Sequence, residues 1–221
     1  RRIIAIAERL ERLTYRLSDA VTVLSGDLLN NLTAKVPADR RGDIEVIANF
    51  VDTGLITPGP RDNDYRREFG LTGTVAMYAG NVGFSQSLDT VIEAARQIDD
   101  ITFVINGDGA ARERLEHQAD GLPNVRFVGY QAPDRLAEVL AAADIHLVPL
   151  RAGLGSVSVP SKTYTALAAA RPVIAAVDSD TAIAQLVADA GCGLAVPPDD
   201  ADALVAAIGE LAADPERCRR L

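Results

Sequence analysis

The sequence predicts an α/β protein whose main part is a doubly wound, parallel β-sheet. From residue 74 onward, short apolar runs alternate with helix-like segments, and the connections are short and rich in glycine. Runs such as residues 145–148 are continuously apolar, as expected of a strand covered on both faces, whereas a half-exposed strand would alternate. Strands that alternate with helices through short connections favour a parallel sheet with right-handed crossovers.

Residues 1–57 predict a smaller number of the same elements. Apolar residues recur at helical spacing over residues 1–18 and predict an amphipathic helix. Residues 20–24 and 44–48 are short runs containing valine and isoleucine, and they predict buried strands. Ser25 follows the first run and is a favoured N-cap for a helix over residues 26–34.

Pro58, Gly59 and Pro60 form the clearest hinge in the sequence, because proline fixes its own backbone and restricts its predecessor. We therefore place a domain boundary there, followed by a short helix over residues 62–69. The predicted organisation is the incomplete end of one domain over residues 1–57, a linker with a short helix over residues 58–73, and a second domain over residues 74–221.

The second domain is predicted to alternate strictly between strands and helices, and its alanine-rich helices indicate close packing against the sheet. The strands are expected at residues 75–79, 101–105, 125–128, 145–148, 173–176 and 194–196. The helices are expected at residues 87–97, 110–119, 133–142, 160–170, 181–190 and 201–212.

The composition excludes several classes of protein. Of the 221 residues, 48% are hydrophobic, which indicates an ordinary globular protein with a substantial core. The net charge of −9 argues against a general affinity for nucleic acid or anionic membranes. This acidity lies in residues 71–221, with 20 acidic and 11 basic side chains, whereas residues 1–70 carry 11 of each.

The sequence also lacks the signals of membrane insertion and secretion. No apolar stretch approaches the ~20 residues that span a bilayer, and no signal peptide is visible. Cys192 and Cys218 fit neither a disulfide framework nor a metal-ligand spacing, which favours a reducing compartment. We therefore expect a cytoplasmic protein. Because the chain opens at Arg1 without an initiator methionine, we also expect a piece of a longer protein.

Glycine-rich turns follow four of the predicted strands. Ligands of open parallel sheets bind beyond the carboxyl ends of the strands, and glycine lets a ligand approach the backbone. Any one such turn is better explained by the geometry of the connection, but four at one edge favour a phosphate-bearing ligand. The turns are Gly80-Asn81-Val82-Gly83, Asn106-Gly107-Asp108-Gly109, Gly129-Tyr130 and Gly153-Leu154-Gly155.

Lys162 is one of only two lysines in the chain and is the strongest candidate for a phosphate contact. It is predicted in the first turn of a helix begun by Pro160, a favoured residue at a helix start, with Ser161 beside it. An ammonium group next to free helix N–H groups can bind several oxygens of a diphosphate. On these grounds alone, a solvated surface lysine is an equal alternative.

Eight segments of the chain carry a resemblance to a known family. They are YRLSDAVTVLS at residues 15–25, VIANFVDT at 46–53, YAGNVG at 78–83, INGDG at 105–109, NVRFVG at 124–129, ADI at 143–145, PSK at 160–162 and RPVIA at 171–175. In this order, they resemble the carboxyl-terminal half of the retaining family 4, or group 1, nucleotide-sugar glycosyltransferases with the GT-B fold. The chain is most similar to members that build bacterial surface polysaccharides from amino-sugar donors.

The resemblance implies that residues 1–57 end an amino-terminal acceptor domain and that a Rossmann-like donor-binding domain follows. In the family, the donor lies in a cleft between two such domains, no metal is required and the anomeric configuration is retained. By position, the phosphates would face Asn81, Gly83 and Lys162, and residues 107–109 with Tyr130 would border the nucleoside. The full set of implied donor contacts is Gly80, Asn81, Gly83, Gln86, Gly107, Asp108, Gly109, Tyr130, Ser161, Lys162 and Thr165.

Two departures from the family pattern bear on activity. Asn81 and Gln86 are neutral amides where many members carry Arg and Lys, although similar surface-polysaccharide members share such amides. Val157 and Thr165 replace the paired glutamates of the family, and a threonine hydroxyl offers fewer acceptor sites for ribose hydroxyls. An alternative is therefore a non-catalytic Rossmann-like domain with a degenerate donor site, serving binding or assembly.

A nicotinamide-dependent oxidoreductase is a further alternative that the sequence disfavours. Its fingerprint needs G-x-G-x-x-G after the first strand and an acidic residue at the end of the second. Here the first turn is Gly80-x-x-Gly83, and the second strand ends at Asn106.

The other polar candidates are better explained by structure than by chemistry. His117 falls on a polar helix face and His146 within an apolar strand, as expected of a surface and a core histidine. Arg151 could reach a phosphate, but solvation is the commoner fate. Asp199, Asp200 and Asp202 stand where a helix begins, so capping and the helix dipole explain them better than a metal does.

The sequence therefore predicts part of a glycosyltransferase of the hexosyl- or N-acetylhexosaminyl-transferring class. It would transfer a sugar with retention from a nucleoside diphosphate, expected to be UDP, to a lipid-linked or saccharide hydroxyl during cell-surface polysaccharide or glycolipid synthesis. Lys162 would stabilise the charge that develops on the leaving diphosphate. We expect no cofactor, no metal and no nucleic-acid partner, membrane contact only through parts outside this chain, and no activity from the isolated piece.

Overall fold

The described residues, 2–221 of the computed structural model, form two compact units. The smaller unit takes the residues up to Asn49 together with Gly155–Val159, and the larger takes Phe50–Leu154 and Pro160–Leu221. The division therefore lies ahead of the predicted hinge at Pro58. The assignment of the smaller unit to an acceptor domain stays a prediction.

Residues 50–60 pack within the larger unit through specific contacts. Ile56 is buried against Leu140 and Ala169. The Arg171 guanidinium donates a hydrogen bond to the Gly59 carbonyl at 2.9 Å. These contacts explain why the units divide before the proline-rich segment, since a hinge needs few contacts on either side.

The smaller unit is an α/β arrangement with little buried surface of its own. Its two strands pair in parallel, with Val21 opposite Ile44. Ser25 accepts a hydrogen bond from the Leu28 N–H and caps the second helix, as predicted. The expectation of buried strands was too strong, because Val23 is the one strand residue there that is buried. The elements are α1 (Arg2–Leu17), β1 (Val21–Val23), α2 (Gly26–Thr33), η1 (Ala38–Asp43) and β2 (Ile44–Val46).

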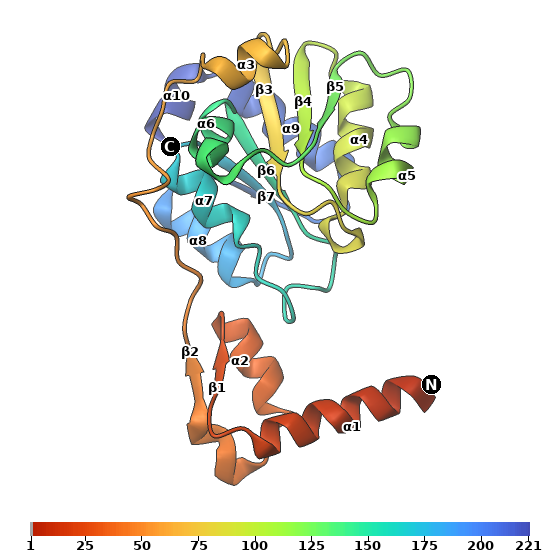
Figure 1. Cartoon of the computed structure of the whole chain (residues 1–221), viewed down its shortest axis with the longest axis vertical. Coiled ribbons are helices and arrows are strands. Elements are labelled where there is room, and N and C mark those ends of the chain that lie inside the picture. Colours follow the sequence, from red (N-terminus) through yellow and green to blue (C-terminus); the bar gives the residue numbers. More distant parts are fainter. Residues whose placement is uncertain (1) are drawn as a thin grey trace. The chain divides into compact units, whose positions relative to one another are not determined.

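A parallel sheet forms the centre of the larger unit, with the strand order β5-β4-β3-β6-β7-β8 (Figure 1). Thr74 lies opposite Ile101 on one side of β3, and Ala76 lies opposite Ile145 on the other. The chain thus winds outward in both directions from the centre, which confirms the predicted doubly wound sheet. The strands are β3 (Thr74–Ala79), β4 (Ile101–Asn106), β5 (Val125–Val128), β6 (Ile145–Pro149), β7 (Val173–Ala176) and β8 (Gly193–Val196).

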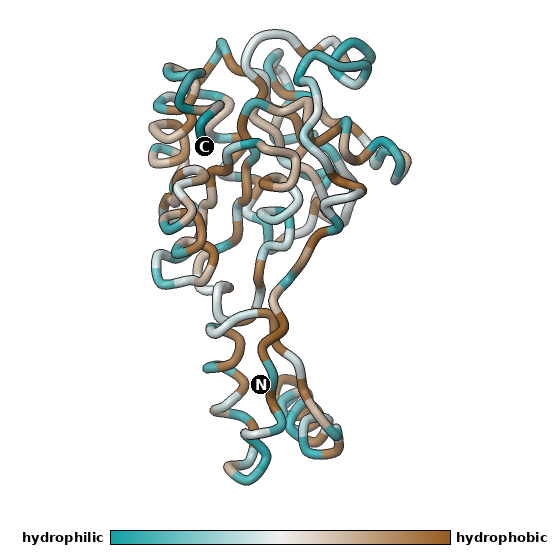
Figure 2. Tube along the Cα trace, turned by 90° about the vertical axis from the view of Figure 1, so that its left-hand side faces the viewer, coloured by the Kyte–Doolittle hydropathy of each residue, from teal (hydrophilic) through white to brown (hydrophobic). Residues whose placement is uncertain are grey.

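Helices cover both faces of this sheet. Helices α4, α5 and α9 pack against one face, and α3 and α6 pack against the other. Figure 2 shows hydrophobic residues gathered in the interior segments of the larger unit and hydrophilic residues on its outer turns. The helices are α3 (Asp64–Glu68), α4 (Leu88–Gln97), α5 (Arg112–Gln118), α6 (Leu136–Ala141), α7 (Lys162–Ala168), α8 (Ala182–Ala190), α9 (Ala201–Ala212) and α10 (Pro215–Arg220), with 3₁₀ turns η2 (Phe84–Gln86) and η3 (Pro133–Arg135).

The amino-terminal edge of the sheet is held by an ion pair between the buried Arg66 and the partly buried Asp144. Asp144, which precedes β6, accepts hydrogen bonds from the Arg66 guanidinium at 2.5 Å and from the Val75 N–H at 2.8 Å. Arg61 approaches the second carboxylate oxygen at 3.2 Å. Arg66 is 4% exposed and also donates to the carbonyls of Ala142 and Gly73. This edge therefore has its charges matched by partners.

Two structural expectations for side chains are confirmed. His146 is buried in β6, and its Nε2 donates to the Leu140 carbonyl at 2.9 Å. Burial lowers the pKa of His146 to about 4, so the imidazole is neutral. His117 is exposed on α5. Cys192 is a buried thiol, and Cys218 Sγ donates to the Leu211 carbonyl at 3.1 Å.

Candidate functional site

The carboxyl ends of β3 and β6 are neighbours at the centre of the sheet. From these two ends the chain leaves in opposite directions, toward β4 and toward β7. Such a point opens a crevice where open α/β sheets bind their ligands. Gly80 directly follows β3, and Lys162 begins α7, the helix that follows β6. The structure therefore brings these two predicted site residues together at the switch point.

The Lys162 ammonium is half-buried and lies 5.6 Å from the centroid of the Tyr78 ring. Burial lowers the pKa of Lys162 below its ordinary value of 10.5, because the charged form loses water. Within residues 2–221, no carboxylate pairs with this ammonium. A partly desolvated cation that contacts a ring but no carboxylate can gain from an anionic ligand, which is the chemistry of a phosphate site.

Two glycines create the close approach around Lys162. Gly80 has φ +147°, and a Cβ there would lie 1.9 Å from Lys162 Cε. Gly107 has the same φ, and its Cβ would lie 1.8 Å from the Gly80 carbonyl oxygen. Because both positions have positive φ and no room for a side chain, glycine is required at each. The turns after β3 and β4 therefore nest against each other and against the lysine stem.

The turn after β3 places its two amides differently. Asn81 is exposed, so its side chain is free to meet a ligand. Gln86 instead folds back on its own turn, where its side-chain oxygen accepts from the Gly83 N–H at 3.0 Å and its nitrogen donates to Ser85 at 3.0 Å. Of the two amides, Asn81 is thus the better placed for phosphate oxygens.

The turn after β4 is braced by its neighbours. Asp108 accepts a hydrogen bond from the Gly109 N–H at 2.7 Å, and the Arg112 guanidinium donates to the Gly107 carbonyl at 2.7 Å. Tyr130 Oη donates to the Asp108 carbonyl at 3.3 Å, while 61% of the tyrosine remains exposed. This arrangement leaves an aromatic surface beside the turn, which suits stacking on a planar base.

The start of α7 differs from the prediction. The helix begins at Lys162, so Pro160 lies outside it and Ser161 is the N-cap residue, without a side-chain capping bond. Thr165 Oγ1 donates to the Lys162 carbonyl at 2.9 Å, and its hydroxyl proton is therefore already engaged. Thr165 retains acceptor capacity alone for a ligand hydroxyl.

The residues around β6 include contacts that the sequence did not reveal. Arg151 donates to the Phe84 carbonyl at 3.1 Å and to Asp89 at 3.3 Å, so it is neither simply solvated nor free for phosphate. Arg114 also bonds Asp89, and this bond is the main reason that the pKa of Asp89 is lowered. The turn that carries the 3₁₀ segment η2 is therefore tied to the connection after β6.

The acidic cluster before α9 divides into two roles. Asp200 caps the helix by accepting from the Ala203 N–H at 2.9 Å, as predicted. Asp199 does not cap; its carboxylate accepts from Ser87 Oγ and from the Ala152 N–H. Among the described residues, no group of three or more His, Cys, Asp or Glu side chains is arranged to hold a metal ion.

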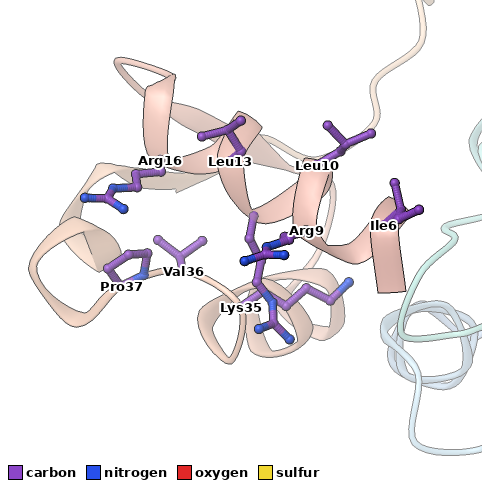
Figure 3. Close-up of a pocket in the computed structure, with 9 residues that line it drawn as sticks. Ile6, Arg9, Leu10, Leu13, Arg16, Lys35, Val36 and Pro37 are labelled. Atoms are coloured by element: carbon purple, nitrogen blue, oxygen red, sulfur yellow. The ribbon is translucent and has the colours of Figure 1, made fainter. Parts of the chain in front are cut away.

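A separate groove of about 650 Å³ lies in the smaller unit (Figure 3). It runs between α1 and residues 35–37, and its lining combines apolar and basic side chains. None of the predicted donor contacts lines it. The residues are Ile6, Arg9, Leu10, Arg12, Leu13, Arg16, Lys35, Val36 and Pro37. Across residues 2–221, no helix combines the length and the apolarity needed to cross a bilayer.

The larger unit matches a known family. Residues 73–214 match the family model described as "Glycosyl transferases group 1". The chain is 35% identical over 139 residues to the putative colanic acid biosynthesis glycosyl transferase WcaI of Escherichia coli K12. That match covers 61% of this chain and 34% of the relative. The probable glycosyltransferase WbjE of Pseudomonas aeruginosa is 26% identical, with 93% of this chain and 52% of the relative covered.

The fold matches solved structures over nearly the whole chain. Sucrose-phosphate synthase from Thermosynechococcus elongatus superposes with a TM-score of 0.79 at 24% identity, covering 96% of this chain and 53% of that one. Anabaena Alr3699/HepE in complex with UDP and glucose also gives 0.79, at 20% identity, covering 96% and 59%. The chain thus spans little more than half the length of these proteins, or less.

Proposed function

The chain belongs to the group 1 glycosyl transferases, and on this premise we propose that its larger unit binds the nucleoside diphosphate of a sugar donor. The whole protein would transfer that sugar, with retention, to a lipid-linked or saccharide hydroxyl in cell-surface polysaccharide synthesis. The names of the relatives support this role, since WcaI is named for colanic acid biosynthesis. The predicted amino-sugar preference and the absence of a metal requirement stay predictions.

The observation that carries the proposal is the unpaired Lys162 ammonium at the switch point of the sheet. Its position beside Gly80 would allow the ammonium and backbone groups of the glycine turn to bind the same diphosphate. When the bond between the sugar and the diphosphate breaks, negative charge develops on the leaving phosphate oxygen. A preorganised cation next to that oxygen stabilises the charge without reorganisation, and this lowers the barrier.

Asn81 and Tyr130 would complete the donor site. The exposed Asn81 amide can donate to a phosphate oxygen without adding charge, so Lys162 supplies the main positive charge in this proposal. Tyr130 offers its exposed ring to the base, next to the turn at Gly107. UDP is the favoured nucleotide, because HepE of similar fold is described in complex with UDP. A non-catalytic domain is the less supported alternative, since the relatives are named as transferases.

The proposal is tested by calorimetric titration of the chain with UDP, GDP, dTDP and ADP. We expect UDP to bind the wild type and Lys162→Ala to weaken it by on the order of tenfold or more, as loss of a charge-assisted contact should. Lys35→Ala is the matched control, because Lys35 is the other lysine and pairs with Glu11 in the smaller unit. Absence of nucleotide binding by the wild type, or equal affinities for the two variants, would refute the donor-site assignment.

Transfer itself is tested with a longer protein that contains this chain, because the chain covers 34% of WcaI and 52% of WbjE. A panel of radiolabelled nucleotide sugars, with release of nucleotide and of labelled product both followed, separates an enzyme from a binding domain. Product formation that Lys162→Ala reduces supports the proposed leaving-group role, whereas nucleotide binding without any transfer supports the non-catalytic alternative.

A further inference from the structure

Ser87 and Asp199 are non-glycine residues with left-handed backbone conformations, and they bond each other. Ser87 has φ 45° and Asp199 has φ 55°. Ser87 immediately precedes α4, and Asp199 precedes α9, a helix that packs beside α4 on the same face of the sheet. The Ser87 hydroxyl donates to the Asp199 carboxylate, although the two residues are 112 positions apart in the sequence.

The conformation of both residues carries a cost that glycine would avoid. A left-handed backbone is unfavourable by about 1–2 kcal/mol for a residue with a Cβ, although aspartate tolerates it better than most. Glycine at either position would adopt the same backbone freely, but it would lose the side-chain bond. Residues kept in such conformations are concentrated where the surrounding structure uses them. The hydrogen bond between the Ser87 and Asp199 side chains is what a glycine at either position would not supply.

The Asp199 carboxylate connects three loops at the carboxyl edge of the sheet. One oxygen accepts from Ser87, at the end of the turn after β3. The other accepts from the Ala152 N–H at 3.0 Å, in the connection after β6. Asp199 itself belongs to the connection after β8. Because Ser87 is 2% exposed, its hydroxyl is shielded from water that would compete for the bond.

Further hydrogen bonds also hold the connection after β6. The Arg151 N–H donates to the Ser85 carbonyl at 2.9 Å, and the Gly153 N–H donates to Asp178 at 2.9 Å. The connection after β6 is thus held at consecutive residues. This connection leads to Lys162, and the turn it is tied to begins with Gly80 and Asn81. The bridge therefore joins the turn that carries Asn81 to the connection that precedes Lys162.

We propose that Asp199 and Ser87 are positioning residues that set the distance between Asn81 and Lys162. They touch no substrate; they act by holding the turn after β3 and the connection after β6 in one arrangement, so that both side chains meet the same diphosphate. The proposal rests on the proposed donor-binding function. It assigns Asp199 a role apart from helix capping, which Asp200 fulfils.

Two variants of Ser87 separate the bond from the backbone conformation. Ser87→Ala and Ser87→Gly both lose the hydroxyl, but the glycine variant is relieved of the left-handed conformation. We expect both to weaken UDP binding about five- to tenfold, as measured by calorimetry, because each loses a bond to a charged group. Thermal unfolding should place Ser87→Gly above Ser87→Ala. Wild-type UDP affinity in Ser87→Gly would overturn the proposal.

A double-mutant cycle tests whether the two residues act through each other. Asp199→Gly should weaken UDP binding as Ser87→Gly does, and the double variant should be little weaker than Asp199→Gly alone. The matched control is the neighbouring Asp200→Ala, which removes a helix cap and should lower the unfolding temperature while leaving UDP affinity unchanged. Additive effects of the two glycine substitutions, or an equal loss of UDP affinity in Asp200→Ala, would contradict a shared positioning role.

A measurement without nucleotide separates this proposal from the function on which it rests. Amide hydrogen exchange at Ala152 and Gly153 should be faster in Asp199→Gly than in the wild type, since the acceptor of the Ala152 N–H is lost. Unchanged exchange there would refute the bridge even if UDP binds. Failure of the wild type to bind UDP while exchange responds as expected would instead refute the donor site and leave the bridge as a structural tie.

Discussion

The cations at the two edges of the central sheet differ in whether a carboxylate pairs with them. At the amino-terminal edge, Arg66 is almost fully buried and bonds the Asp144 carboxylate as well as two carbonyls. At the carboxyl-terminal edge, Lys162 is half-buried, and burial alone lowers its pKa. A buried cation stabilises a fold only when it has partners. The first edge therefore serves stability, and the second retains a charge that a ligand can neutralise.

The backbone does not follow this division, because Ala170 before β7 has φ 52° and a Cβ at Gly193 would lie 1.9 Å from the Val173 carbonyl oxygen. The turns at the carboxyl edge contain Gly80 and Gly107, which have positive φ and no room for a Cβ, and also the left-handed Ser87 and Asp199. The difference between the two edges therefore lies in the partners of Arg66 and Lys162. The comparison indicates that substitutions at the amino edge should change folding stability, whereas those at the carboxyl edge should change UDP affinity.

The largest expected effect is at the amino edge. Asp144→Ala leaves Arg66 buried without its carboxylate and removes the acceptor of the Val75 N–H, so the free energy of unfolding should fall by about 3–5 kcal/mol. Urea denaturation measures the loss. Asp62→Ala is the control, because Asp62 is 84% exposed and its pairs with arginines should contribute under about 1 kcal/mol. Similar losses of unfolding free energy in both variants would contradict the stabilising role of the amino edge.

The next effect is the acid limit of stability, set by His146 beside the same edge. Burial lowers its pKa from 6.5 to about 4, so between these values the unfolded chain binds a proton that the folded chain does not. Stability should therefore fall as the pH drops from 6.5 to 4, by about 2–3 kcal/mol from this residue. NMR titration of the His146 imidazole checks the shift. Protonation of His146 near pH 6.5 in the folded protein would contradict the prediction.

The smallest effect has the opposite sign and is at the carboxyl edge. Lys162→Met replaces an unpaired, partly desolvated ammonium with an apolar chain, so the chain without ligand should gain about 1 kcal/mol at neutral pH. Because burial lowers the pKa of Lys162, the folded wild type releases its proton before the unfolded chain does, and the gain should shrink as the pH rises toward 10.5. Parallel denaturant titrations at neutral and alkaline pH measure it. A marked loss of stability in Lys162→Met would show that the lysine is structural.

Much of the fold follows from local patterns in the sequence. The continuous apolar runs predicted β3 to β8 and their parallel pairing, because a strand buried on both faces leaves a clear signal. Helix starts were predicted less well: α7 begins at Lys162, since proline at residue 160 is compatible with a preceding turn as well as with a helix. The helix α10 was not predicted, because Pro215–Arg220 has little apolar periodicity.

The candidate site was predictable where a residue acts through its own type and position. Lys162 and Gly80 could be named because a rare lysine and a glycine turn follow neighbouring strands. The tie between Ser87 and Asp199 could not, because it joins positions 112 residues apart and depends on how two helices pack. The sequence predicted helix capping for Asp199 as well as for its neighbour Asp200, and only Asp200 caps the helix. Arg151 was likewise expected to be solvated, since its carbonyl partner at Phe84 carries no sequence signal.

The packing of residues 50–60 on the larger unit has a practical consequence for recombining this chain with its relatives. A crossover placed at the proline-rich hinge would separate Ile56 from Leu140 and Ala169, and the recipient would have to cover the exposed apolar surface. A crossover between Asn49 and Phe50 keeps those contacts and the bond from Arg171 to Gly59 within one parent. Chimeric proteins joined at Phe50 should therefore inherit the thermal stability of the parent that supplies the sheet.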